Sequence, residues 1–309
     1  MKEEISNNKF LLAIIVVAVI GIIVVIILMI NNGNEINVYD YYSGNQREDA
    51  SGNKMINLWN EGNIPTVINY TENNGGYFDD PDFVPYITEY NVLDGVDVKG
   101  AVLINPGGAF MFRSEVTEGS EVAEKLSSLG YVSFVVHYRL QPYTMQEWAL
   151  DLARAVRYVR ANAEVYGINP DNIAIIGFSA GGILCGESFT YDGFRISVLD
   201  SDYVPDELDE VASDVKAVGM IYAFYGRLSH ASLDVDMFRD ANLPPTFYAY
   251  GTEDPFYNQM NASVDALEEA RVSVSAHVLA NMFHEFGVGS NDNQWINSFD
   301  EWLSDIFTN

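Results

Sequence analysis

The chain shows two hydrophobic patterns: one long apolar segment near the beginning, and after it short apolar runs that alternate with helical periodicity. The long segment covers residues 10–30, is interrupted only by Gly21 and contains no charged side chain. A helix of this length spans roughly 30 Å, the thickness of the hydrocarbon core of a bilayer. A signal peptide has an apolar region of only about 7–15 residues and then a small-residue cleavage motif, and no such motif follows Ile30. Residues 10–30 are therefore predicted to form an uncleaved transmembrane signal anchor.

The charges around this segment predict its orientation. Lys2 and Lys9 precede it, and the next basic residue is Arg47. Positively charged residues stay on the cytoplasmic side of a membrane. We therefore expect residues 1–9 in the cytoplasm and the remainder outside the cell, held by a single-pass anchor in the cell membrane, or secreted if the anchor is cleaved.

The remainder of the chain divides near residue 64. Residues 31–63 are polar and rich in Asn, Gly and Asp, which indicates a stalk that runs into the edge of a domain. In the domain, residues 64–309, short apolar runs alternate with segments of helical periodicity. The expected strands are residues 86–93, 100–105, 131–138, 173–178, 217–224, 246–250 and 272–279. The expected helices are residues 120–129, 145–166, a stretch after Ser179, 257–270 and 294–307.

Strands separated by helices of this length pair in parallel, and the crossover helices cover both faces of the sheet. The pattern predicts an α/β fold with a mostly parallel central sheet. Residues 186–215 break the alternation, because this stretch is acidic and weakly periodic. It is predicted to be an insertion at the rim of the domain, and it is equally consistent with a partial lid and with an ordinary acidic surface loop.

Composition excludes several classes of function. The 309 residues carry a net charge of −28, which argues against binding to nucleic acid or to an anionic membrane surface, and mildly against a strongly anionic substrate. The single cysteine, Cys185, cannot form an internal disulfide and is expected to be buried. The Cys and His pattern predicts no metal site, and no cofactor is expected.

A candidate nucleophile follows one of the predicted strands. Residues 177–182 read Gly-Phe-Ser-Ala-Gly-Gly, directly after the apolar residues 173–176. A buried strand that runs into G-x-S-x-G and then into a helix is typical of a nucleophile elbow. In such a turn Ser179 takes a strained conformation, and side chains at Gly177 and Gly181 would collide with neighbouring backbone.

A serine nucleophile needs a base, and the base can be found by elimination among four histidines. In this topology the order along the chain is Ser, then an acid, then His. His137 and His230 precede any suitable acid, and His277 lies inside a predicted strand. His284 lies in the loop after that strand and is assigned as the base.

The acid and the oxyanion donors are expected at other strand ends. Asp254 follows the predicted strand 246–250 and is assigned as the acid that orients His284, with Glu253 as the alternative. The first oxyanion donor is expected to be the N–H of Ala180, the residue after the nucleophile. The others are assigned to the turn after strand 100–105, at Gly107, Gly108 and Ala109.

Together these residues resemble the α/β-hydrolase superfamily, in its hormone-sensitive-lipase-like and acetylxylan-esterase-like (BD-FAE-type) branch. The resemblance covers roughly residues 55–309 and rests on residues 105–110 (Asn-Pro-Gly-Gly-Ala-Phe), 138–140 (Tyr-Arg-Leu), 177–182, 251–254 and 283–284. Two residues depart from the pattern: Asn105 stands where relatives more often have His, and Glu285 stands where many have Gly. The resemblance implies a serine esterase.

The implied reaction is ester hydrolysis through an acyl-enzyme. A small-molecule or carbohydrate ester is the expected substrate, with a short acyl group such as acetyl and with acetylated xylan as one example. Candidate lining residues of such a site are Phe110, Phe112, Tyr143, Tyr225, Phe256 and Tyr257. Two alternatives stay open: a serine exopeptidase of the same fold and a non-catalytic, membrane-anchored binding protein. The sequence predicts no oligomeric state.

Overall fold

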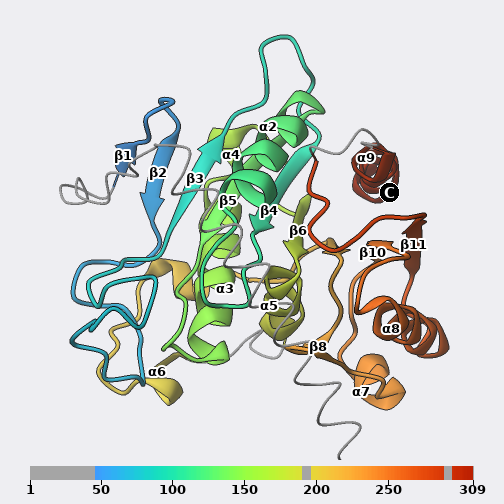
Figure 1. Cartoon of the computed structure of the whole chain (residues 1–309). Helices are drawn as coiled ribbons and strands as arrows, with labels where there is room; N and C mark the ends of the chain where they lie inside the picture. Colours follow the sequence, from blue (N-terminus) through green and yellow to red (C-terminus); the bar gives the residue numbers. More distant parts are fainter. Residues whose placement is uncertain (1–45, 190–195, 289–293, 309) are drawn as a thin grey trace, which may run out of the picture. The chain divides into compact units, whose positions relative to one another are not determined.

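The computed structural model describes residues 46–189, 196–288 and 294–308, which belong to one compact unit, Asn45–Asn309 (Figure 1). The predicted cytoplasmic segment 1–9, the predicted anchor 10–30 and the first part of the predicted stalk lie outside these residues. No helix in the described ranges is long and apolar enough to span a bilayer.

A nine-stranded sheet runs through the middle of this unit (Figure 1). Across the sheet the order is β1-β2-β3-β5-β4-β6-β7-β10-β11, and the strands from β5 to β11 are parallel, whereas β1, β2 and β3 pair antiparallel. The bounds are β1 Gln46–Glu48, β2 Lys54–Asn57, β3 Tyr86–Tyr90, β4 Gly100–Asn105, β5 Tyr131–His137, β6 Ile173–Phe178, β7 Ala217–Ile221, β10 Thr246–Gly251 and β11 Val274–Leu279. The strands β8 (Gly226–Arg227) and β9 (His230–Ala231) form a separate hairpin.

Helices cover both faces of the central strands. The bounds are η1 Val116–Ser120, α2 Glu121–Ser128, α3 Met145–Ala161, α4 Ala163–Tyr166, α5 Ala180–Ser188, α6 Ile196–Leu199, η3 Glu207–Glu210, α7 Val235–Asp240, α8 Tyr257–Glu269 and α9 Gln294–Thr308. All residues of β4 and β6 are buried. Because successive side chains of a strand point to opposite faces, both faces of these strands are covered. The expected α/β fold with a mostly parallel sheet is confirmed.

The domain begins earlier than the sequence suggested. The second half of the segment predicted as stalk and domain edge contains β1 and β2, which extend the antiparallel edge of the sheet. Ile56 and Trp59 from this stretch are each only 3% exposed. The domain boundary expected at residue 64 is corrected to Asn45, because these few apolar residues bury themselves against the sheet despite their polar surroundings.

The described part of the segment 186–215 is tied to the body of the domain. Arg154 of α3 donates to Asp206 through Nη1 at 2.7 Å, and Asn63 exchanges two hydrogen bonds with the backbone of Val204. The ring of Tyr203 packs edge-to-face on Trp59, with 5.8 Å between the centroids. Residues 190–195 lie outside the described ranges, so a lid function of this segment stays a prediction.

Candidate active site

The elbow between β6 and α5 holds Ser179 in a strained conformation. Its backbone angles are φ 49° and ψ −118°, in a region that side-chain-bearing residues rarely adopt. A Cβ at Gly177 would lie 2.3 Å from the carbonyl oxygen of Gly181, and one at Gly181 would lie 2.0 Å from the carbonyl oxygen of Asn105. Both positions must be glycine for β6 to turn this sharply into α5.

The structure brings three predicted side chains into one hydrogen-bonded chain. The Ser179 hydroxyl lies 2.9 Å from Nε2 of His284, and Nδ1 of His284 lies 2.7 Å from Oδ2 of Asp254. With the proton on Nδ1, that nitrogen donates to the carboxylate and Nε2 accepts from the serine hydroxyl. This is the arrangement in which an imidazole can remove the serine proton.

The turns after β10 and β11 place the acid and the base. Asp254 accepts a 2.8 Å hydrogen bond from the Phe256 N–H on Oδ1, which leaves Oδ2 for His284. The two turns pack closely, since a Cβ at Gly251 would lie 2.0 Å from the carbonyl oxygen of Met282. Glu253, the alternative acid, is exposed, and the carboxylate bonded to His284 belongs to Asp254.

The electrostatic surroundings favour the protonated form of His284. Burial lowers the pKa of His284. The hydrogen bond and charge of Asp254, together with the charges of Glu285 and Glu118, raise the pKa by more than burial lowers it, so the net shift is upward from 6.5. The ring lies between two aromatic side chains, with centroids 4.8 Å from Tyr222 and 5.8 Å from Phe256. These contacts hold the imidazole in place.

The turn after β4 packs against Ser179 through Gly107 and carries two backbone N–H groups at the next two residues. Gly108 and Ala109 have positive φ angles of 128° and 54°, and neither N–H donates to another described residue. The N–H of Ala180 lies in the first turn of α5 and so has no acceptor within the helix. These three groups can serve as oxyanion donors.

Gly107 does not fit its predicted role as a donor. Its N–H donates to Oε2 of Glu118 at 2.7 Å and is therefore not free to bind an oxyanion. Its glycine character has another cause, because a Cβ here would lie 2.6 Å from the Phe178 carbonyl oxygen and 2.9 Å from Cβ of Ser179. The assignment of Gly107 to the oxyanion hole is corrected.

Glu118 and Tyr222 are two residues at the site that the sequence analysis missed. The Tyr222 hydroxyl donates to Oε1 of Glu118 at 2.7 Å, and the Tyr222 ring packs on His284. Nothing in the local pattern separates Glu118 from its acidic neighbours Glu115 and Glu121. Its closeness to a Gly-Gly turn after a strand is the one signal that sequence reasoning had available.

Asn105, the departure from the usual histidine, fastens the end of β4. It is fully buried, and its Nδ2 donates to the carbonyl oxygen of Ile176 at 3.2 Å and to Sγ of Cys185 at 3.4 Å. The side chain thus holds the oxyanion turn to β6 and α5. Cys185 is buried, as expected. Burial raises the pKa of its thiol, so the thiol stays protonated.

The predicted aromatic lining residues divide by burial. Phe110 and Tyr225 are 2% and 3% exposed, and Phe110 stacks on Trp148, so both are part of the core. Phe112, Phe256 and Tyr257 are half-buried.

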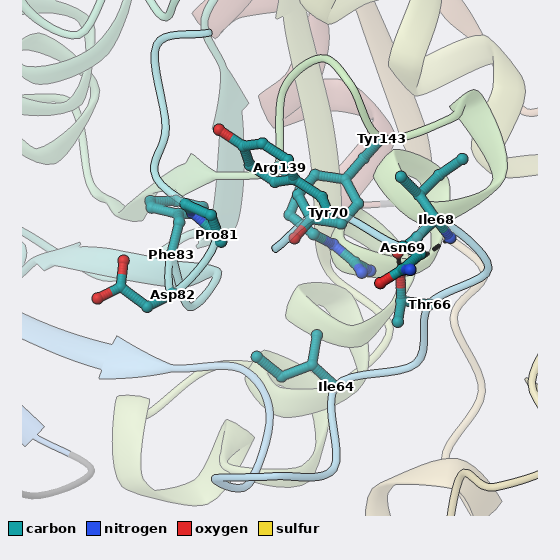
Figure 2. A pocket seen from close by; sticks show the side chains of 10 residues that line it. All are labelled: Ile64, Thr66, Ile68, Asn69, Tyr70, Pro81, Asp82, Phe83, Arg139 and Tyr143. Atoms are coloured by element: carbon teal, nitrogen blue, oxygen red, sulfur yellow. Dashed lines mark hydrogen bonds between the residues drawn. The ribbon is translucent and has the colours of Figure 1, made fainter. Parts of the chain in front are cut away.

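The sixth aromatic residue, Tyr143, lines a hollow. The cavity measures about 260 Å³ and lies between the loop of residues 64–83 and the turn at residues 139–143 (Figure 2). Tyr70 and Tyr143 stand edge-to-face there, 5.9 Å apart. None of its lining residues belongs to the triad or to the oxyanion turn.

Two of the other histidines lie away from Ser179, and one of them, His137, is hydrogen-bonded to the Thr88 hydroxyl at 3.0 Å and to Glu115 at 3.1 Å. His137 stacks on Tyr86 at 4.0 Å, and His277 stacks on Phe247 at 4.6 Å. Within the described residues, no group of three or more His, Cys, Asp or Glu side chains is arranged to hold a metal ion.

Comparison with known proteins finds named esterases among the similar chains. Residues 96–219 match the BD-FAE family model. An acetylxylan esterase of Xylanibacter ruminicola is 34% identical over 96 residues, which are 31% of this chain and 20% of that protein. Esterase LipC of Mycobacterium tuberculosis is 35% identical over 123 residues, which are 39% of this chain and 28% of that protein.

The fold has solved counterparts. An acetyl ester-xyloside bifunctional hydrolase from Caldicellulosiruptor lactoaceticus aligns with a TM-score of 0.61 and 24% identity, over 82% of this chain and 96% of that chain. This likeness shows the fold that the two proteins share. The chain spans less than a third of the length of either curated relative named above.

Proposed function

We propose that this chain, which has the α/β-hydrolase fold and matches esterases over part of its length, is a serine carboxylesterase that acts on short-chain acyl esters. The observation that carries the proposal is the hydrogen-bonded chain from Ser179 through His284 to Asp254, with distances of 2.9 and 2.7 Å. A merely structural serine has no need of a strained backbone and a buried imidazole–carboxylate pair. The same geometry gives each residue a role.

In the first half of the reaction, Ser179 Oγ attacks the ester carbonyl carbon while His284 Nε2 takes the serine proton. The carbonyl π electrons move to the oxygen, where the N–H groups of Ala180 and of Gly108 or Ala109 bind the negative charge. The tetrahedral intermediate then collapses, the bond to the alcohol oxygen breaks, and His284 returns the proton to the leaving alcohol. Ser179 is left acylated.

In the second half, a water molecule attacks the acyl-enzyme and His284 takes a proton from it. The carboxylic acid leaves and the proton returns to Ser179, which restores the free enzyme. Asp254 accepts from Nδ1 of His284 throughout, so it holds the productive tautomer and stabilises the imidazolium. No step in this scheme uses a cofactor.

For the substrate we propose an acetyl ester on a carbohydrate such as acetylated xylan. Two of the similar proteins are named an acetylxylan esterase and an acetyl ester-xyloside bifunctional hydrolase. The net charge of −28 favours such neutral substrates over anionic ones. We also propose that residues 10–30 anchor the chain in the cell membrane with the catalytic domain outside, where a polymer that does not enter the cell can reach it.

The test compares the full-length chain with its Ser179→Ala variant on p-nitrophenyl acetate and on acetylated xylan. Loss of the nucleophile should lower kcat by about 10⁴-fold or more. Ser201→Ala, at an exposed serine, is the matched control and should keep its activity. Release of acetate from xylan by the wild type would support the carbohydrate substrate.

Other outcomes point to the alternatives. Hydrolysis of a short aminoacyl anilide in place of both esters would indicate a serine exopeptidase. A wild-type chain that turns over none of the three substrates would favour a non-catalytic binding protein and would overturn the proposal.

A further inference from the structure

A ring of three hydrogen bonds joins Gly107, Ser114 and Glu118 at the base of the oxyanion turn. The Gly107 N–H donates to Oε2 of Glu118 at 2.7 Å, and the Gly107 carbonyl accepts from the Ser114 N–H at 3.0 Å. The Ser114 carbonyl in turn accepts from the Glu118 N–H at 3.1 Å. Gly108 and Ala109 belong to the loop of residues 108–113 that connects Gly107 to Ser114, so the Glu118 carboxylate holds the end of the loop from which their N–H groups project.

The second oxygen of the same carboxylate reaches the other side of the site. Oε1 of Glu118 accepts from the Tyr222 hydroxyl at 2.7 Å. Tyr222 follows β7 with a φ of 38°, and its N–H donates to the Ala249 carbonyl at 2.7 Å. Its ring packs between His284 at 4.8 Å and Phe286 at 4.7 Å. One carboxylate therefore joins the oxyanion turn to the aromatic ring that supports the base.

The location of Glu118 is unfavourable for a carboxylate with a purely structural role. Glu118 is 2% exposed, and the donors to its two oxygens are a backbone N–H and a phenol, both neutral. Burial raises the pKa of Glu118 to about 7, with a further rise from Glu285, while Tyr222, Gly107 and His284 oppose the increase. The charge of Glu118 also acts on Tyr138, whose hydroxyl donates to the Pro106 carbonyl at 2.6 Å. An apolar side chain would fill the same space without the desolvation penalty.

The backbone at Glu118 is also unusual. The residue lies in η1, a single π-helical turn at Val116–Ser120, and such turns occur often at functional sites. The turn directs the Glu118 side chain back toward Gly107 and Tyr222 just before α2 begins.

We propose that Glu118 is a positioning residue of the esterase reaction, because it fixes the oxyanion turn against Ser179 and supports the ring that packs on His284. The inference rests on the proposed function. Glu118 forms no bond to substrate. It acts through the N–H groups of Gly108 and Ala109, and its negative charge favours the imidazolium form of His284.

The experiment uses three variants of the full-length chain on p-nitrophenyl acetate, with kcat and KM measured from pH 5 to pH 9. Glu118→Ala removes both acceptors, and kcat should fall by roughly 10²-fold with KM little changed, as expected for a small displacement of the reacting groups. Glu118→Gln keeps an acceptor for Gly107 and a donor for the Tyr222 oxygen, so it should restore most of kcat. Glu121→Gln, at an exposed neighbour, controls for the loss of a charge.

The pH profile separates this role from simple packing. Glu118, with a pKa of about 7, carries its charge near and above that pH, and there the charge raises the pKa of His284. Glu118→Gln should therefore move the part of the kcat/KM limb that lies near and above pH 7 to lower pH, and Glu121→Gln should leave it in place. A folded Glu118→Ala variant with wild-type kcat would overturn the inference. If Glu118→Ala does not fold, the Glu118→Gln profile decides, and an unshifted limb counts against the proposal.

The failure of the two proposals would look different. If the wild-type chain hydrolyses the ester, and the Glu118 variants keep the wild-type kcat and the wild-type pH profile, Glu118 has no positioning role and the proposed function stands. A wild-type chain with no activity on any ester would remove the proposed function and, with it, the basis for this role.

Discussion

At the scale of single residues, two adjacent acids have different surroundings. Asp254 is 4% exposed and bonded to His284, whereas Glu253 is exposed. Asp254→Asn should lower kcat by roughly 10³–10⁴-fold, because an amide no longer fixes the imidazole tautomer or stabilises its charge. Glu253→Gln is the matched control and should change kcat less than about threefold. Stopped assays of both variants on p-nitrophenyl acetate check this, and equal losses would reassign the acid.

The same residues show how far the sequence could predict the site. Ser179, His284 and Asp254 were identified because each directly follows a strand whose apolar run is easy to read. The oxyanion turn was located for the same reason. The sequence does not show which N–H groups of the oxyanion turn lack a hydrogen-bond partner, because the partner of Gly107 lies eleven residues away on a different turn. The sequence does not identify Glu118 and Tyr222, because their role depends on contacts with Gly107 and His284 that lie far from them in sequence.

At the scale of elements, long buried strands could be predicted and short edge strands could not. β4 and β6 have the bounds that their apolar runs predict. β1 and β2 are three and four residues long and half-exposed, so neither shows an alternation that stands out from a polar segment. The predicted helix 145–166 divides into α3 and α4 at Asn162. For the strands, the hydrophobic pattern that allows prediction depends on the length of the strand and on burial of both of its faces.

A buried ion pair joins α3 to the strand beside it. Arg139 follows β5 and donates to Asp151 of α3 through Nε at 2.9 Å and Nη2 at 2.8 Å, and both side chains are almost fully buried. The Trp59 indole donates to the same carboxylate at 2.8 Å, so the stretch after β2 is tied to this pair as well. The pair therefore connects three elements that are far apart in sequence.

Removal of one partner should be costly. Asp151→Asn removes the carboxylate that is bonded to the buried Arg139 and leaves only the charge of Glu147 near it, so it should lower the free energy of unfolding by about 3–5 kcal/mol. Asp236→Asn breaks an exposed pair with Arg239 within α7 and should cost less than about 1 kcal/mol. Urea unfolding followed by tryptophan fluorescence measures both. Similar midpoints for the two variants would mean that the buried pair contributes little.

At the scale of the whole molecule, the proposed anchor determines where the chain is held. If residues 10–30 span the membrane, the full-length chain should remain with the membrane fraction after alkaline carbonate extraction. A variant with Val19→Arg and Ile20→Arg should move to the soluble fraction, because each arginine at the centre of a spanning helix costs about 2.5–3.5 kcal/mol. External protease should cleave the domain on intact cells. Recovery of the wild-type chain in the soluble fraction would contradict the proposal that residues 10–30 anchor it in the membrane.

The ring at the base of the oxyanion turn separates two properties that an enzyme must adjust independently. Its hydrogen bonds involve the backbone of Gly107 and Ser114, while in the loop between them Met111 is 53% exposed and Phe112 is half-buried. The exposed Met111 side chain can change in size and polarity with little effect on the donors, whereas the Phe112 ring lies against Gly108. Substrate preference can therefore diversify among descendants of this protein, or in directed evolution, while the rate-determining chemistry is preserved.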